Sequence, residues 1–303
     1  MNTKKKQILS RVGGLILLTV LVILIYYNNS KSDKDTYSSS ERTGIVEVHF
    51  IDVGQGDAIL IEADNHAMLV DAGENYAERV VIDYLEANHI SRLDYVIGTH
   101  PHSDHIGGLD GVLNRYPTDR LFLPSVTHTT KTFENLLDAI EDNQLNITKP
   151  DMGQAYSFGP ATFTFVAPNS DEYEEMNDYS IGIKLTYGST SFLLLGDAGK
   201  ASEQEMLKNH YDLSADVLKL SHHGSSDSNS EPFLDAVDPT YAVISLGKDN
   251  DYGHPHAETM KEMMEREIKV YRTDQQGTII FASDGKNISV NKENYLITEE
   301  DIK

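Results

Sequence analysis

Residues 99–108 read Thr-His-Pro-His-Ser-Asp-His-Ile-Gly-Gly and directly follow an apolar, strand-like segment. Three histidines and one aspartate fall within six residues of this stretch. Imidazole and carboxylate are the ligands that first-row divalent metals favour where no thiolate is present. Alternate side chains of an extended chain point to the same side, so His100 and His102 can reach one ion. Asp104 and His105 follow a turn and can face a second ion, so the stretch predicts a metal site at a strand end.

Three further apolar runs with the character of strands end in the same residue types. The residues that follow these runs are Asp71, Asp197 and the adjacent pair His222 and His223. Functional side chains of α/β folds come disproportionately from the loops at strand ends. We therefore expect these residues to join the first stretch in one site.

The ordered set resembles the metallo-β-lactamase superfamily. A closer likeness, to the metallo-β-lactamase domain of ComEC-type competence proteins and their stand-alone relatives, rests on four segments: His49–Ala58, Gly196–Ala198, Lys219–Ser225 and Tyr252–Pro255. The likeness extends from about residue 45 to residue 281. It implies an α/β fold, the αββα sandwich of this superfamily, and a metal-dependent hydrolase.

The resemblance also implies a ligand set for two divalent metal ions. His100 and His102 would hold the first ion, and Asp197 would bridge the two. The ligands of the second ion would be Asp104, His105 and His222. Asp71 would orient the cluster from behind, as ligating imidazoles usually require. Many members of the family use a further histidine between the Asp-His pair and the bridging aspartate, and His128 is the histidine in that interval; its role as a ligand stays open.

Nitrogen and oxygen ligands admit zinc, manganese or iron, and we expect zinc, with manganese as the alternative. Asp104 and His254 are the expected catalytic residues, because His254 lies in a turn from which it can protonate a leaving oxygen or hold a phosphate oxygen. His223 is either an alternative ligand in a shifted register or a hydrogen-bond donor to the substrate. Asp57 either orients the metal cluster or caps the Gly-Gln-Gly turn that precedes it.

The N-terminus is distinct from the rest of the chain. Four basic residues at positions 4–11 precede the apolar run Val12–Tyr27, which with Ile8 and Leu9 approaches the ~20 residues that span a bilayer. Positive charge before the run predicts a cytoplasmic N-terminus and an extracytoplasmic remainder. The run lacks a small-residue cleavage pattern, so an uncleaved anchor is preferred over a cleaved signal peptide. The expected location is the cell membrane, with a single span.

The chain is expected to divide into four parts. Residues 1–27 form the basic N-terminus and signal anchor, residues 28–44 a flexible tether, residues 45–291 the catalytic domain, and residues 292–303 a polar tail. Within the domain, helices are predicted over Ala77–Asn88, Phe133–Glu141 and Ala257–Glu267, where apolar residues recur at helical spacing. The strands are predicted over Ile45–Asp52, Ala58–Ala63, Ala161–Val166, Ile181–Tyr187, Ser191–Leu195, Tyr241–Leu246 and Gly277–Ala282.

Charge and cysteine content narrow the range of partners. Beyond Arg42 the chain has 18 Lys and Arg against 45 Asp and Glu, a net charge of about −27. Such a surface disfavours tight binding of duplex nucleic acid and of anionic membranes. The chain contains no cysteine, which excludes lipoprotein attachment, disulfides and thiolate metal sites.

The predicted function is hydrolysis of phosphodiester bonds, either nuclease-like or directed at a small molecule, a surface polymer or single-stranded nucleic acid. Two metals suit this reaction because they clamp the oxygens of an in-line displacement. Hydrolysis of a lactone or amide by the same fold is the alternative enzyme hypothesis. A binding protein that keeps the fold without turnover is the alternative from another class. Full ComEC-type proteins join this domain to a multi-span channel, so a role in DNA transport does not follow.

Overall fold

The structure is a computed structural model that describes residues 43–303. The predicted anchor, residues 1–27, and nearly all of the predicted tether, residues 28–44, lie outside the described residues. Within the described range, no helix is both long and apolar enough to cross a bilayer.

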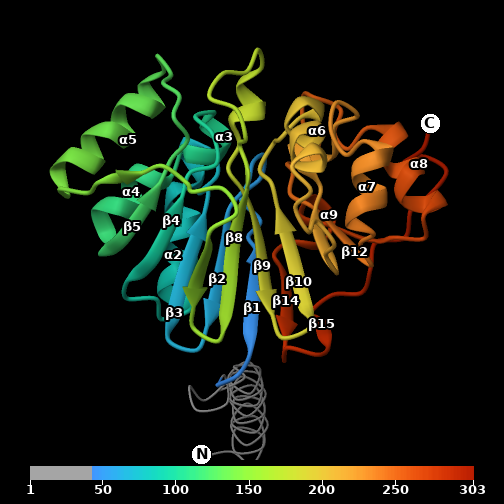
Figure 1. Ribbon diagram of the computed structural model, residues 1–303, viewed down its shortest axis with the longest axis horizontal. Coiled ribbons are helices and arrows are strands. Elements are labelled where there is room, and N and C mark those ends of the chain that lie inside the picture. Colours follow the sequence, from blue (N-terminus) through green and yellow to red (C-terminus); the bar gives the residue numbers. More distant parts are fainter. Residues whose placement is uncertain (1–42) are drawn as a thin grey trace, which may run out of the picture. The chain divides into compact units, whose positions relative to one another are not determined.

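Two sheets form the centre of the described part (Figure 1). The eight-stranded sheet has the order β15-β14-β1-β2-β3-β4-β5-β6 and the seven-stranded sheet the order β13-β12-β11-β10-β9-β8-β7. The strands of the first sheet are β1 (Val46–Phe50), β2 (Ile59–Ala63), β3 (His66–Val70), β4 (Leu93–Ile97), β5 (Thr118–Phe122), β6 (Ile147–Thr148), β14 (Ile279–Ser283) and β15 (Ile288–Val290). Those of the second are β7 (Ala155–Phe158), β8 (Ala161–Ala167), β9 (Gly182–Tyr187), β10 (Thr190–Leu194), β11 (Val217–Lys219), β12 (Tyr241–Ile244) and β13 (Lys269–Arg272).

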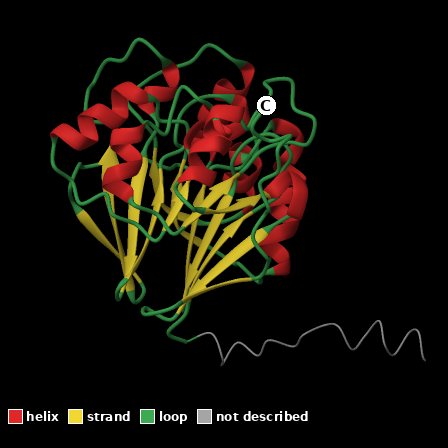
Figure 2. Ribbon diagram, turned by 90° about the vertical axis from the view of Figure 1, so that its right-hand side faces the viewer, coloured by secondary structure: helices red, strands yellow, loops and turns green. Residues whose placement is uncertain are grey.

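Helices cover the outer face of each sheet (Figure 2). On the first sheet they are α2 (Glu78–Ala87), α3 (Ser103–Ile106), α4 (Leu109–Arg115) and α5 (Lys131–Asp142); on the second, α6 (Lys200–Lys208), α7 (Glu231–Val237), α8 (Ala257–Glu265) and α9 (Thr273–Gln276). Short 3-10 turns are η1 (Asn75–Ala77), η2 (Met176–Tyr179) and η3 (Ser221–Gly224). Three apolar clusters fill the spaces between these layers. The arrangement is an αββα sandwich, which confirms the predicted fold class of this part of the chain.

Strand alternation explains the central cluster. Val46, Val48 and Phe50 of β1 point to the space between the sheets, as side chains two residues apart must. They meet residues such as Phe163 and Phe192 from the second sheet. Fully burying such aromatic side chains stabilises the fold by roughly 1.5–3 kcal/mol each.

Helix α5 shows how local sequence sets an outer layer. Phe133, Leu136 and Ile140 recur at helical spacing and are buried against the first sheet. Thr130 caps the helix, because its side chain accepts a hydrogen bond from the Phe133 N–H at 3.3 Å, as N-cap threonines do. The predicted helix began at Phe133, two residues after the observed start at Lys131.

The last residues of the chain pack against the second sheet. Residues 292–303 were expected to be a polar tail, yet Tyr295 and Ile297 contact the apolar cluster on that side. The Tyr295 N–H donates to the carbonyl of Val270 in β13 at 2.7 Å. Arg272 pairs with Asp301 at 3.0 Å. These contacts tie the end of the chain to β13.

Candidate metal centre

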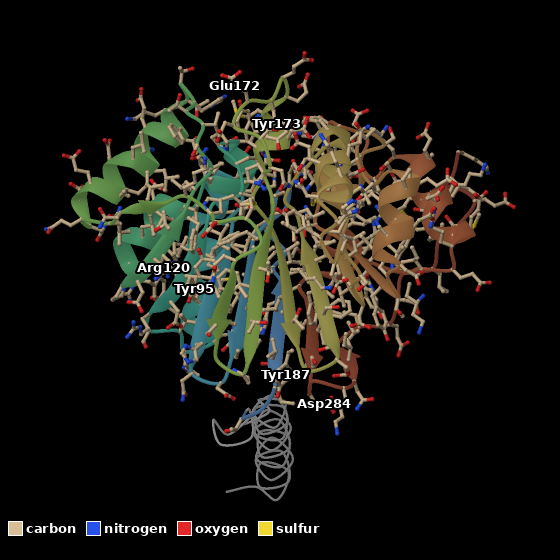
Figure 3. The ribbon with its side chains drawn as sticks, viewed as in Figure 1. Tyr95, Arg120, Glu172, Tyr173, Tyr187 and Asp284 are labelled. Atoms are coloured by element: carbon tan, nitrogen blue, oxygen red, sulfur yellow. The ribbon has the colours of Figure 1, made fainter. Side chains whose placement is uncertain are left out.

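The predicted site residues come from the ends of strands in both sheets. Strands β3 and β4 of the first sheet are parallel neighbours, as are β10 and β11 of the second. The carboxyl ends of parallel neighbours meet at one edge, so their loops gather there. In Figure 3, Glu172 and Tyr173 lie at one end of the molecule, and Tyr187 and Asp284 lie at the opposite end.

His105 is the centre of the cluster. Its Nδ1 donates to Asp71 Oδ2 at 2.8 Å, and its Nε2 lies 3.2 Å from Asp197 Oδ2. Asp71 in turn accepts hydrogen bonds from the backbone N–H and the hydroxyl of Thr99, each at 2.7 Å. Asp71 thus fixes the orientation of the His105 ring and directs Nε2 toward Asp197, which is the orienting arrangement common around ligating imidazoles.

His223, rather than His222, lies beside the other predicted ligands of the second ion. Its Nε2 is 3.3 Å from Asp104 Oδ2 and 3.5 Å from Asp197 Oδ2. Its Nδ1 donates to the carbonyl oxygen of Ser245 at 2.7 Å, which points Nε2 into the cluster. Asp104, His105, Asp197 and His223 therefore form one group of potential ligand atoms.

His222 has different neighbours from the group that contains His223, and its role as a ligand stays a prediction. Its ring contacts the side-chain amide of Asn177 and packs on His254, with ring centroids 5.2 Å apart. Both His222 and His223 have positive φ, 52° and 54°. Strand alternation ends at β11, so the turn η3 decides which imidazole faces the carboxylates.

The predicted ligands of the first ion also lie together. His100 Nε2 is 3.0 Å from His102 Nδ1 and 3.9 Å from Asp197 Oδ2. The His128 ring lies near the His102 ring, with centroids 6.0 Å apart, while His128 Nδ1 bonds to the Thr130 hydroxyl at 3.0 Å. The structure thus brings His128 to the rim of the cluster, and its role as a ligand stays a prediction.

Buried polar atoms without hydrogen-bond partners test whether the cluster fits a metal. Three such atoms are His105 Nε2, His223 Nε2 and Asp197 Oδ1. Buried polar atoms almost always find a partner, and exceptions require an explanation such as a bound ion. Both imidazole atoms lie beside the same Asp197 carboxylate. The donor set fits divalent cations that accept nitrogen and oxygen ligands.

The carboxylates and imidazoles shift one another's pKa values. Burial alone would lower the pKa of His105 and of His223, but Asp197 and Asp104 raise the first well above its usual range and the second to about 9. Burial would raise the pKa of Asp197, but His105 and His223 hold it well below its usual range. In the absence of ions, protons on the imidazoles balance the buried carboxylates. His100 behaves differently, because burial and the neighbouring His105 lower its pKa.

His254 lies at the edge of this cluster. Its ring packs on His222 and stacks with Tyr252, with centroids 5.2 Å and 5.7 Å apart. Its backbone N–H donates to Asn250 Oδ1, whose side-chain amide donates back to the His254 carbonyl. Burial and the neighbouring imidazoles lower its pKa to about 4, so His254 is neutral at physiological pH in the free site.

The loop over residues 169–178 contributes to the site, although the sequence did not place it. Tyr173 and Ser170 both donate to the carboxylate of Glu205 in α6, which fastens the loop to that helix. Asn177, near the end of the loop, reaches His222.

Two cavities flank the cluster. A cavity of about 360 Å³ opens at Asp197 and His222 between Asn177 and Lys200. An apolar cavity of about 220 Å³ lies on the other side, beside His100 and Pro101, and its walls are mainly Ile106, Leu123, Val126, Phe133, Leu136 and Leu137.

Two buried residues beneath the cluster complete it. Asp57, which the sequence left as either an orienting residue or a turn cap, forms an ion pair with Lys219, whose Nζ is 2.5 Å from Asp57 Oδ2. Sequence reasoning did not single out Lys219. The available signal was a lysine inside the apolar run Val217–Leu220, because a lysine is almost never fully buried without a partner.

The chain belongs to the metallo-beta-lactamase superfamily, whose family model matches residues 51–248. With the histidine–aspartate cluster, this membership identifies the chain as a metal-dependent hydrolase of that fold. The resemblance predicted from the sequence is confirmed.

Two relatives resemble this chain over most of its length. ComE operon protein 3 of Bacillus subtilis is 31% identical over 286 residues, which cover 88% of this chain and 35% of that protein. Competence protein ComA of Neisseria gonorrhoeae is 29% identical over 232 residues, which cover 76% of this chain and 31% of that protein. The chain thus spans about a third of the length of these relatives.

A solved structure shows the same fold. The metallo-beta-lactamase fold protein YhfI from Bacillus subtilis superimposes with a TM-score of 0.53 at 16% identity, covering 79% of this chain and 99% of that one. The likeness extends to the fold alone.

Proposed function

We propose that the protein is a membrane-anchored, extracytoplasmic hydrolase that cleaves phosphodiester bonds with two divalent metal ions, zinc being the expected metal and manganese the alternative. The observation that carries this proposal is the convergence of His105 Nε2 and His223 Nε2 on the Asp197 carboxylate without hydrogen-bond partners. His100 and His102 would hold one ion and Asp197 would lie between the two. The ligands of the other ion would be Asp104, His105 and His223.

Bound metals would supply an activated water and stabilise charge on the substrate oxygens. The chain's own residues hold the ligand atoms in place. Asp71 and the Ser245 carbonyl accept the Nδ1 protons of His105 and His223, so each ring offers Nε2 as a ligand. Neutral His254, which packs on His222 of the cavity wall, can accept a proton or a hydrogen bond from a substrate that reaches it. Donating a proton would require that substrate binding first raise its pKa.

The substrate is proposed to be a phosphodiester that enters through the cavity beside Asp197. Small diesters, surface polymers or single-stranded ends touch only this cleft, whereas the net charge of about −27 beyond Arg42 opposes binding of long polyanions. One of the two relatives, ComA, is a competence protein by name, and the likeness to this chain covers about a third of each relative's length. Hydrolysis of a lactone or amide, and binding without turnover, are outcomes that the test separates.

The test combines metal analysis with a panel of substrates. Purified full-length protein reconstituted with zinc or manganese should hold about two ions per chain and should hydrolyse a generic diester faster than a monoester, a lactone or a lactam. Asp197→Ala should lose the metal pair and the activity, while His210→Asn, at an exposed position, should retain both. One ion or none per chain, or rapid lactone hydrolysis without diesterase activity, would overturn the proposal.

A further inference from the structure

A buried lysine lies under the metal ligands. Lys219, the last residue of β11, has no exposed surface. Its Nζ is 2.5 Å from Asp57 Oδ2 and 3.8 Å from Asp197 Oδ1, and it donates to the Gly196 carbonyl at 3.0 Å. A cation in such a place is stable only when it is paired and hydrogen-bonded. Lys219 does not line either of the cavities that flank the site. It therefore acts on a substrate through the electrostatic field of its charge and not through direct contact.

The charges around the ligands can be counted. Two overlapping groups of potential ligands contain four carboxylates, those of Asp57, Asp71, Asp104 and Asp197. Lys219 is the cation in contact with them, so the set carries a net charge of −3 when the imidazoles are neutral. Two divalent ions bring the total for these side chains and the metals alone to +1. A proton moved from Lys219 to Asp57 leaves this total unchanged.

We propose that Lys219, by offsetting the charge of Asp57, sets the metal-loaded centre to a net charge of +1 and thereby selects substrates with a single negative charge. A phosphodiester carries one such charge, whereas an ester or a lactone carries none. The inference rests on the function proposed above and adds a specificity-determining pair to it. Without Lys219 the loaded centre would be neutral, and the attraction that distinguishes an anionic diester from a neutral ester would be lost.

Two single substitutions should act in opposite directions. Lys219→Met removes the positive charge and keeps the length of the side chain, so the metal-free site becomes more negative and should bind the second ion roughly ten- to a hundredfold more tightly. The same change should lower the ratio of kcat/KM for an anionic diester to that for a neutral ester by a similar factor. Asp57→Asn should weaken binding of the second ion and raise that ratio.

The double variant Lys219→Met/Asp57→Asn is the matched control. It removes both charges and restores the net charge of the wild-type site. Metal affinity and substrate ratio should return toward the wild-type values. A purely structural role predicts the reverse, because loss of the Lys219 contacts would loosen the ligands in either single variant and in the double variant alike.

The measurements use the full-length protein. Metal-free protein is titrated with zinc in competition with a chelating indicator, which gives the affinity for each ion without any turnover. Bis(p-nitrophenyl) phosphate and p-nitrophenyl acetate then provide a singly charged diester and a neutral ester with the same leaving group. Thermal unfolding shows that each variant is folded at the assay temperature.

The outcomes separate the two proposals. If both single variants bind zinc more weakly than the wild type, or if the substrate ratio is the same in all four proteins, the role of the pair is refuted. If Lys219→Met does not fold, Asp57→Asn still decides, since it must weaken binding of the second ion and raise the ratio. Wild-type protein without any diester hydrolysis would refute the proposed function. The changes in zinc affinity in the single and double variants would still decide whether Lys219 and Asp57 set the charge of the centre.

Discussion

At the scale of single residues, the ligands depend on side chains that hold them in one orientation. Asp71 has positive φ, 58°, and lies fully buried where it accepts hydrogen bonds from Thr99 and His105. Such left-handed backbone costs about 1 kcal/mol or more in a residue other than glycine and tends to occur at functional sites. This backbone conformation directs the Asp71 carboxylate toward Nδ1 of His105.

Asp71→Asn should therefore weaken metal binding by about 10–100-fold. An asparagine amide facing Nδ1 of His105 favours the tautomer with its proton on Nε2, which blocks the ligand atom. The metal affinity is measured by competition with a chelating indicator. Thr99→Ser keeps the hydroxyl that contacts Asp71 and serves as the control, with an affinity near that of wild type. Equal affinities in Asp71→Asn and Thr99→Ser would contradict the orienting role.

The metal-free protein should lose stability as the pH rises. The pKa of His223 in the folded chain is raised to about 9, above the ~6.5 of an unfolded histidine. Its contribution is fully present below pH ~6.5 and disappears as the pH passes ~9, a change on the order of 3 kcal/mol. Metal binding displaces the same proton, so zinc affinity should rise across this window.

Thermal unfolding of chelator-treated protein between pH 6.5 and 9 measures the effect. The fall in Tm should be clearly smaller in His223→Gln, which cannot take up the proton. A wild-type Tm that falls no more than that of the variant would show that His223 does not carry this charge.

At the scale of elements, the loop before β2 supports the short helix α3, which carries Asp104. Gly56 has φ of +115°, and a Cβ at this position would lie 2.0 Å from the Asp104 carbonyl oxygen. The N–H of Asp57 donates to the same oxygen at 3.0 Å. The backbones of the loop and of α3 are therefore in direct contact, which only glycine permits at this place.

Gly56→Ala should displace Asp104 and reduce metal binding as well as stability. We expect a loss of more than 2 kcal/mol in the free energy of unfolding, from the unfavourable φ and the backbone clash together. Gly277→Ala is the matched control, because its φ is +69° and nothing lies within 4 Å of the added Cβ. Chemical denaturation and zinc titration of both variants test the prediction, and similar losses in the two would show that the contact with Asp104 is unimportant.

At the scale of the whole molecule, the negative charge should govern which polymers reach the site. A protein that binds DNA through many phosphate contacts loses affinity steeply as salt rises. For this chain we expect weak binding of duplex DNA, with a shallow dependence on salt between 50 and 200 mM, alongside turnover of small diesters. Fluorescence anisotropy with labelled duplex and single-stranded oligonucleotides measures both. Tight duplex binding with a steep salt slope would reveal a basic surface that the net charge conceals.

The proposed topology is also a property of the whole chain. Protease added to intact protoplasts should remove the hydrolase domain if the basic N-terminus is cytoplasmic and the domain lies outside. A cytoplasmic protein serves as the protected control. A protected domain, or a mature N-terminus found near Asn28, would contradict the anchored arrangement.

The sequence by itself determined which residue types form the centre and where they lie along the chain. The apolar runs of β3, β4, β10 and β11 are local patterns, and the histidines and aspartates that follow them are visible without a fold. Helices α2, α5 and α8 were predicted for the same reason, since their apolar spacing repeats within a few residues. Strands β5, β6 and β13 were missed, because the polar residues within or beside them leave no continuous apolar run.

Only the tertiary structure showed that His223 lies beside Asp104 and Asp197, because two successive residues with positive φ override the alternation of a strand. The ion pair between Lys219 of β11 and Asp57, which precedes β2, is also visible only in the tertiary structure. An ion pair between segments far apart in the sequence leaves no periodic pattern in the sequence of either segment. The tertiary structure also placed Tyr295 and its neighbours on β13, where tertiary contacts override a polar local composition. Local patterns report what a segment favours alone, whereas these three features depend on what the fold places beside it.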